Sequence, residues 1–118
     1  MDSLDALREG RLNGARQLHL ACGLTEFPRA IFALAASLEL LNLSGNALDA
    51  LPADIGRLHR LRVLFCSDNR FTELPPALGD CAALEMIGFK ANRIRSVPPS
   101  SLPPQQPVVQ GLEAVGGE

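Results

Sequence analysis

Side chains that could carry out acid–base, nucleophilic or metal-binding chemistry are few in this chain of 118 residues. Its two histidines, His19 and His59, are far apart in the sequence and belong to no HxxxH pair. Its three cysteines, at positions 22, 66 and 81, form no CxxC pair, so the spacing typical of zinc sites is missing. The glycines make neither a GxGxxG fingerprint nor a Walker loop, the two motifs that cradle phosphates. The sequence therefore predicts no catalytic site, no metal site and no cofactor.

Composition and charge narrow the remaining classes of protein. The formal net charge of -2 gives no general attraction to nucleic acid or to an anionic membrane. The first residues, MDSLDALREGRLNG, are acidic where a secretory signal needs positive charge followed by an apolar run. An odd number of cysteines is more typical of a reducing compartment than of a disulfide framework. We expect a cytoplasmic protein that binds neither nucleic acid nor membrane.

A repeat of constant length organises the chain. Asn46, Asn69 and Asn92 follow one another at a 23-residue period, within the segments LELLNLSGNAL, LRVLFCSDNRF and LEMIGFKANRI. Each segment is apolar at its positions 1, 4, 6 and 11 and has asparagine at position 9. A proline motif follows each segment at the same offset, in LPADIGRL, LPPALGDC and VPPSSL. This regularity predicts a stack of similar short units.

The first copy of the repeat, ARQLHLACGL, is irregular. One residue is missing before Leu24, so that Cys22 takes the position of the asparagine. One residue is gained after the next proline motif, so the spacing from Ala15 to Leu38 equals that of the regular copies. The two changes compensate, which indicates a unit fitted to a stack of constant repeat length.

Stacking is what would give these units a core. Positions 3 to 5 are predicted to form a short strand, with the side chains at positions 4 and 6 pointing inward. A single unit cannot bury its leucine face alone, whereas stacked units share one core and one parallel sheet. We predict an α/β fold, a short right-handed solenoid with about four parallel strands and an N-terminal capping helix. Its predicted parts are a cap over 1–14, repeats over 15–104 (15–37, 38–60, 61–83 and 84–104), and a divergent tail over 105–118.

Both ends of such a stack need a cover, because terminal units otherwise expose their core. At the front, we expect a short helix capped by Ser3, running to about Glu9 and stopped by Gly10. At the back, a fifth strand at the same period would place Gln110 where an inward leucine is required, which leaves Ile87 near an open edge. The tail folding back, another molecule or further repeats could cover this edge, and self-association through it is one prediction.

The asparagine of each unit is predicted to be structural, since its amide can satisfy backbone groups of the tight turn. The residues in this role are Cys22, Asn46, Asn69 and Asn92. Of the other two cysteines, Cys66 occupies an inward position and is expected in the core. Cys81 falls in an outer turn, which makes it the one candidate for a reactive thiol.

The outward side chains of the predicted strands form the candidate binding surface. An apolar patch is expected in its middle, and contiguous exposed apolar surface often marks a partner site, although such residues also favour strands for their own sake. The candidate partner-binding residues are His19, Leu40, Asn42, Val63, Phe65, Met86 and Lys90. Four strands offer a face of only about 300 Å², whereas a stable interface needs about 800 Å² per partner. Charge is also uneven, with 4 basic and 7 acidic residues in 1–56 against 7 basic and 4 acidic in 57–95.

The frame LxxLxLxxNxLxxLPxxIGxL resembles the cytosolic leucine-rich repeats of the Ras-suppressor type. The segments LHLACGLTEFP, LRVLFCSDNRFTELP and FKANRI are similar to the N-terminal repeats of bacterial leucine-rich-repeat proteins that carry a kinase-like domain. The resemblance covers about residues 4–104, and no kinase motif is present in the chain. It implies a non-enzymatic protein–protein interaction module with an unidentified protein partner. The alternative is a truncated sensor or substrate-docking region of a bacterial repeat-containing kinase.

Overall fold

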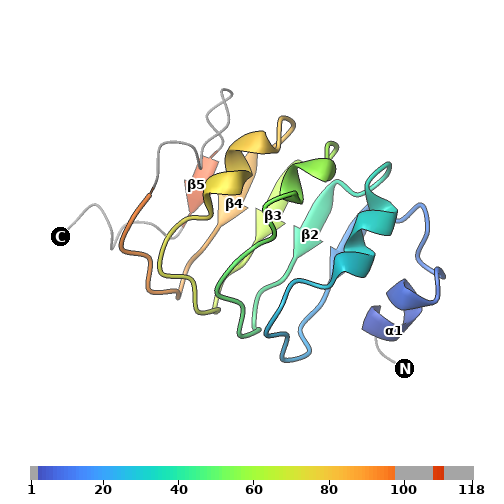
Figure 1. Cartoon of the computed structure of the whole chain (residues 1–118), viewed down its shortest axis with the longest axis horizontal. Coiled ribbons are helices and arrows are strands. Elements are labelled where there is room, and N and C mark those ends of the chain that lie inside the picture. The colour runs from blue at the N-terminus through green and yellow to red at the C-terminus, as the bar shows by residue number, and fades with distance from the viewer. Residues whose placement is uncertain (1–2, 98–107, 111–118) are drawn as a thin grey trace.

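In the computed structural model, which describes residues 3–97 and 108–110, each repeat contributes one short strand to a single parallel sheet (Figure 1). The strands are β1 (Gln17–His19), β2 (Leu40–Asn42), β3 (Val63–Phe65), β4 (Met86–Gly88) and β5 (Val108–Gln110). They lie in the sheet in the order of the sequence, and every neighbouring pair is parallel. The predicted α/β solenoid is confirmed.

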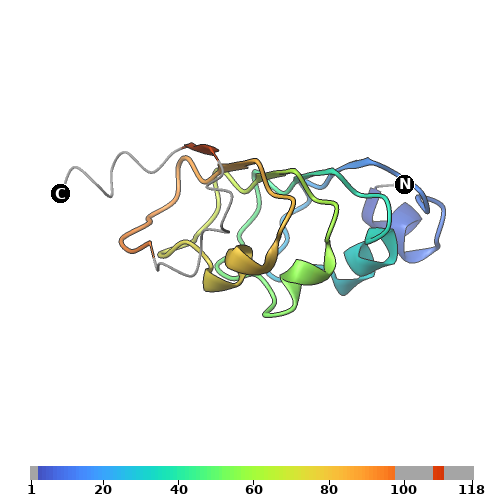
Figure 2. The ribbon, with the colours of Figure 1, turned by 90° about the horizontal axis from the view of Figure 1, so that it is seen from above.

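Short 3-10 helices form the second layer, on the side of the core away from the sheet (Figure 2). They are η1 (Arg29–Leu34), η2 (Ile55–Arg57) and η3 (Pro76–Asp80). Pro76 is the first residue of η3, where the proline ring fixes its own φ in the range that the first turn of a helix requires. Pro28 and Pro75 are extended residues that directly precede η1 and η3. Each of the first three repeats thus runs from a strand through a turn to a short helix and back to the next strand.

The core lies between these two layers and is built from repeat positions. Leu18, Leu41, Leu64 and Ile87 pair in register across β1 to β4 and are buried. The residues on either side of each in the strand are more exposed, except in β4, so the strands alternate inward and outward as their period of two requires. Two phenylalanines of neighbouring repeats pack edge to face with ring centroids 5.1 Å apart, namely Phe71 and Phe89.

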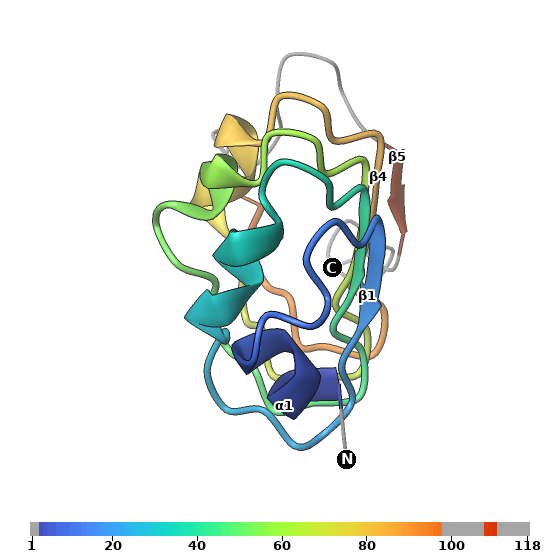
Figure 3. The same ribbon diagram turned by 90° about the vertical axis from the view of Figure 1, so that its right-hand side faces the viewer.

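The N-terminal cover is a helix, as expected, and it lies at the end of the stack beside the first repeat (Figure 3). Helix α1 spans Ser3–Arg8, so that Ser3 is its first residue rather than the residue before it. Gly10 has a φ of 78°, which glycine adopts without strain and which ends the helix. Leu7 is buried in the core, and Leu4 and Leu12 pack against it. Among the described residues no helix is long and apolar enough to cross a membrane.

The C-terminal end differs from the expectation of about four strands, because β5 adds a fifth. Met86 pairs with Val108 and Gly88 pairs with Gln110, so this step along the chain is one residue shorter than the steps between the earlier strands. Gln110 therefore pairs with Gly88, whereas a constant 23-residue step would have paired it with Ile87. Backbone groups at the edge of β4 gain partners in this way. Ile87 is fully buried, and of the three covers considered for this edge the structure shows the chain's own C-terminal segment, through β5.

Candidate functional site

The face of the sheet turned away from the 3-10 helices, here called the sheet face, carries two rows of outward side chains. It consists of Gln17, His19, Leu40, Asn42, Val63, Phe65, Met86 and Gly88. The register places Val63 between Leu40 and Met86 in one row, and Phe65 between Asn42 and Gly88 in the other. Leu40, Val63, Phe65 and Met86 are all half-buried. The structure therefore brings the apolar candidates together as one patch over β2 to β4.

The ring of Phe65 packs closely against Gly88, its partner on the neighbouring strand. A Cβ atom added at Gly88 would lie 2.8 Å from Cδ1 of Phe65, so the ring occupies the space that any side chain at this position would need. Gly88 is buried in consequence. The close approach depends on glycine because a bare backbone lets a neighbouring group come near. The ring of Phe65 is thus half-buried and packs against Gly88 of the neighbouring strand.

The polar candidates lie around this patch. His19 is exposed on β1, at the N-terminal end of the sheet face, and Lys90 is exposed just beyond β4. The side chain of Asn42 is engaged within the protein, since its Oδ1 accepts a hydrogen bond of 2.9 Å from the backbone N–H of Ser44. Of the sequence candidates, His19 and Lys90 therefore flank the patch, whereas Asn42 stabilises the turn after β2.

The asparagines of position 9 join neighbouring repeats. In each, the Nδ2 group donates to a carbonyl of its own repeat and to a carbonyl of the preceding one, while Oδ1 accepts from a backbone N–H of the preceding repeat. For Asn69 these partners are the carbonyl oxygens of Cys66 at 3.1 Å and Leu43 at 2.9 Å, and the N–H of Leu48 at 3.0 Å. Asn69 is the one polar residue among those described that is buried. We call this series of contacts the asparagine ladder.

Asn46 and Asn92 repeat the pattern, and Cys22 departs from it. Asn92 accepts from the N–H of Phe71, and Asn46 accepts from the N–H groups of Leu24 and Cys22, each at 3.0 Å. The side chain of Cys22 is exposed, so the structure places only its backbone in the ladder. The first repeat has no preceding repeat whose carbonyl a side chain could reach, which is why it forms no such contact there.

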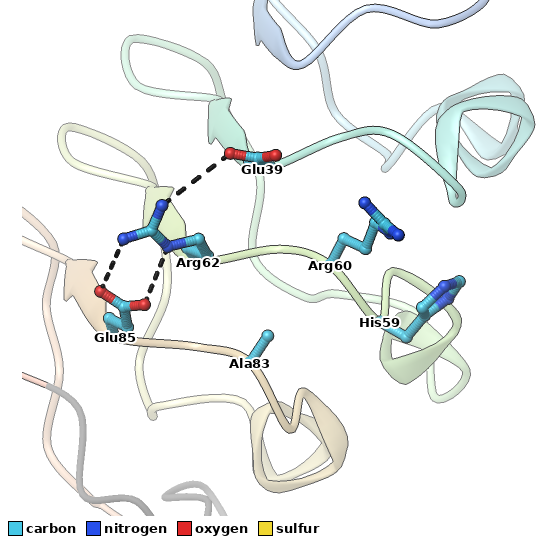
Figure 4. A pocket seen from close by; sticks show the side chains of 6 residues that line it. All are labelled: Glu39, His59, Arg60, Arg62, Ala83 and Glu85. Atoms are coloured by element: carbon cyan, nitrogen blue, oxygen red, sulfur yellow. Dashed lines mark hydrogen bonds and ion pairs between the residues drawn. The ribbon is translucent and has the colours of Figure 1, made fainter.

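A row of charges that the sequence reasoning missed lies just before the strands. Arg62 binds Glu85 through Nε at 2.8 Å and Nη2 at 3.2 Å, and it lies 3.9 Å from Glu39 on the other side (Figure 4). Hydrogen bonding to Glu85 raises the pKa of Arg62, and the same bonds lower the pKa of Glu85. The available signal was the charge alternation of Arg16, Glu39, Arg62 and Glu85 at the 23-residue period. A shallow hollow of about 380 Å³ adjoins this row, with His59 and Arg60 at its far side.

A second ion-pair cluster joins the outer helices of neighbouring repeats. Asp54 accepts hydrogen bonds from Arg29 at 2.7 Å and from Arg57 at 3.4 Å. The bond from Arg29 is the main reason that the pKa of Asp54 falls to about 2. The two guanidinium groups also lie over the ring of Phe32, at 5.0 and 4.4 Å from its centroid. In both clusters, the charged side chains form ion pairs with other residues of the protein.

The cysteines differ from expectation in one case. Cys81 is fully buried, with its Sγ 3.8 Å from the carbonyl oxygen of Ile55, so the prediction of a reactive thiol there is wrong. Burial is the main reason that the pKa of Cys81 rises to about 11, and burial also raises the pKa of the Cys66 thiol. A thiol needs to ionise before it reacts as a nucleophile. The outer turn that holds Cys81 packs against the neighbouring repeat, which a single unit of sequence does not reveal.

We expect one thiol of the native chain to react with a disulfide reagent such as Ellman's reagent, and that thiol to be Cys22. Cys22 is exposed, whereas the other two thiols are buried and poorly ionised. Absorbance of the released thiolate measures the number of reacting groups before and after unfolding in guanidinium chloride. The Cys22→Ser variant should show none in the native state and two after unfolding. A native signal that survives this substitution would contradict the buried position of Cys66 and Cys81.

In the described part of the chain, no three histidine, cysteine or acidic residues come together in a group that could hold a metal ion. His19 lies on the sheet face, and His59 lies in the connection after η2, where its Nδ1 is 3.2 Å from the carbonyl oxygen of Arg57.

Comparisons with known proteins agree with this architecture. The family model described as Leucine Rich Repeat matches residues 37–58 and 60–81. Solved structures also match, among them a leucine-rich repeat protein of Leptospira interrogans, with a TM-score of 0.64 and 31% identity over 80% of this chain. The chain spans 24% of that protein's length. A search of the curated proteins finds no match.

Proposed function

Because this chain belongs to the leucine-rich repeat family, whose domains generally bind protein partners, we propose that its sheet face is the surface to which a partner protein docks. The observation that carries the proposal is the patch of Leu40, Val63, Phe65 and Met86, four half-buried apolar side chains on adjacent strands. Phe65 is its centre, because the ring is seated over Gly88 and still partly exposed. Rigid aromatic side chains in the middle of a patch are the residues that contribute most to binding.

Charge replacement on the patch is expected to abolish partner binding. In the Phe65→Glu/Met86→Glu double variant, two carboxylates would have to be desolvated against an apolar partner surface. Removal of a central anchor commonly costs at least about 2 kcal/mol, or about thirtyfold in Kd. Immobilised wild-type and variant chains, exposed to a lysate and analysed by quantitative mass spectrometry, report which proteins are lost.

The matched control adds the same two charges elsewhere. Ala33→Glu/Ala53→Glu alters two exposed residues of the outer connections and should retain every partner. Circular dichroism verifies that both double variants are folded. Equal recovery of all partners by the wild type and the Phe65→Glu/Met86→Glu variant would contradict docking at the sheet face.

A cytoplasmic location is part of the proposal. The exposed thiol of Cys22 and the absence of any disulfide among the three cysteines are compatible with a reducing compartment. The alternative function, a docking region of a repeat-containing kinase, rests on sequence resemblance alone. Kinase motifs in the coding DNA downstream of this chain would favour it.

A further inference from the structure

Four cationic residues lie in the segments that follow β3 and β4 in the sequence. In Figure 1 these segments form loops at one edge of the solenoid, where the chain leaves the sheet. We call this surface the basic edge; it consists of Arg70, Lys90, Arg93 and Arg95. All four side chains are exposed. In the described part of the molecule, no carboxylate lies within ion-pair distance of any of them.

This arrangement is the opposite of the one found before the strands. There the charges alternate in sign from repeat to repeat, and Arg62 is held between Glu39 and Glu85. At the basic edge, Arg70 and Arg93 occupy the same position of successive repeats with the same sign. Like charges on adjacent chain segments destabilise, because the repulsion is not compensated within the protein. A negatively charged ligand would pair with these cations, as Glu39 and Glu85 pair with Arg62 before the strands.

The backbone holds the neighbouring repeats side by side, and two of the four cations, Arg70 and Arg93, line a hollow. The N–H of Arg93 donates to the carbonyl of Phe71 at 3.0 Å, and the N–H of Arg95 donates to the carbonyl of Thr72 at 2.7 Å. Neighbouring repeats of the sheet are about 4.8 Å apart, so the two guanidinium groups can reach one ligand. The hollow has a volume of about 740 Å³. It is lined by Asn69, Arg70, Thr72, Ala91, Asn92 and Arg93.

We propose that the basic edge binds an acidic peptide segment of a protein partner. Guanidinium groups bind carboxylates through paired hydrogen bonds, and two of them on one hollow can hold successive acidic side chains. The exposed carboxylates of Asp68 and Glu73 interrupt the basic surface, which disfavours the continuous phosphate backbone of a nucleic acid. The net charge of -2 also differs from the strongly basic balance of nucleic-acid-binding domains. The basic edge adjoins the sheet face at Lys90, but Arg70 and Arg93, which line the hollow, lie outside the apolar patch. The binding of an acidic segment therefore does not depend on that patch.

The test is a titration of the full chain into a fluorescein-labelled peptide of consecutive glutamates, followed by fluorescence anisotropy. We expect binding at low ionic strength that weakens by at least about tenfold at 0.2 M salt, because exposed charges are then screened within about 8 Å. The Arg70→Glu/Arg93→Glu variant should bind at least about tenfold more weakly than the wild type. If that variant is unfolded by circular dichroism, the milder Arg70→Gln/Arg93→Gln variant takes its place, with the same direction expected.

Three controls make the result specific. The Arg8→Glu/Arg60→Glu variant changes the net charge equally at two exposed arginines outside the basic edge and should bind within about twofold of the wild type. A glutamine peptide of the same length should not bind. Equal weakening by both charge-reversed variants, equal binding of the glutamine peptide, or tighter binding of single-stranded DNA than of the acidic peptide would overturn the proposal. A Phe65→Ser/Met86→Ser variant, which alters the apolar patch without adding charge, should bind the peptide unchanged, which separates this site from the sheet face.

Discussion

Replacement of Leu41 by alanine is expected to lower the free energy of unfolding by about 3 kcal/mol, a value typical of a fully buried leucine. Leu41 points from β2 into the core and lies in register between Leu18 and Leu64. Both neighbouring strands pair with β2, so the backbone cannot easily move in to fill the cavity that alanine leaves. Denaturant unfolding followed by circular dichroism should show a lower midpoint with an unchanged slope.

The adjacent residue is a matched control for this prediction. Leu40 belongs to the same strand and has the same side chain, but it faces outward and is only half-buried. Leu40→Ala should cost about 1 kcal/mol or less, because it removes less apolar area from the core and leaves no closed cavity. Equal losses at Leu40 and Leu41 would contradict the alternation of inward and outward side chains in β2.

Replacement of Asn69 by alanine is expected to cost about 2 to 3 kcal/mol, the second largest effect. The carbonyl oxygens of Leu43 and Cys66 would keep the neighbouring asparagines, Asn46 and Asn92, as donors. The N–H of Leu48, whose partner is Oδ1 of Asn69, would remain buried without one. An unsatisfied buried donor alone costs about 1–3 kcal/mol, and the lost volume of the side chain adds to it. Denaturant unfolding again measures the change.

Alanine variants of two further asparagines serve as comparisons for Asn69→Ala. Asn13→Ala alters an exposed residue outside the ladder and should change stability by no more than about 0.5 kcal/mol. Asn46→Ala should fall between the two, because its acceptor contacts go to N–H groups that are exposed or only partly buried. An Asn69→Ala variant as stable as Asn13→Ala would contradict a stabilising role for the asparagine ladder.

Several features of the site could be read from the sequence, and others could not. The 23-residue period placed Leu40, Val63 and Met86 in one row, because each strand position recurs at the same offset. The same period contained the alternating charges around Arg62. They indicate ion pairs only when the repeats are known to stack on one another. The packing of Phe65 against Gly88 could not be predicted from the sequence, because it depends on the direction in which the Phe65 side chain extends over the next strand.

The sequence by itself determined the repeat, its inward leucines and the residues that face outward, because these follow from side-chain type at a constant spacing. The tertiary structure alone decided what happens between units and at the ends. It added β5 at a step one residue shorter than the others, and it buried Cys81 against the neighbouring repeat. It also left Arg70 and Arg93 without an ion-pair partner among the described residues. The physical reason is that backbone pairing sets the register between repeats. A side chain's neighbours in the next repeat then follow from that register, and they are not encoded in the residues adjacent to it in the chain.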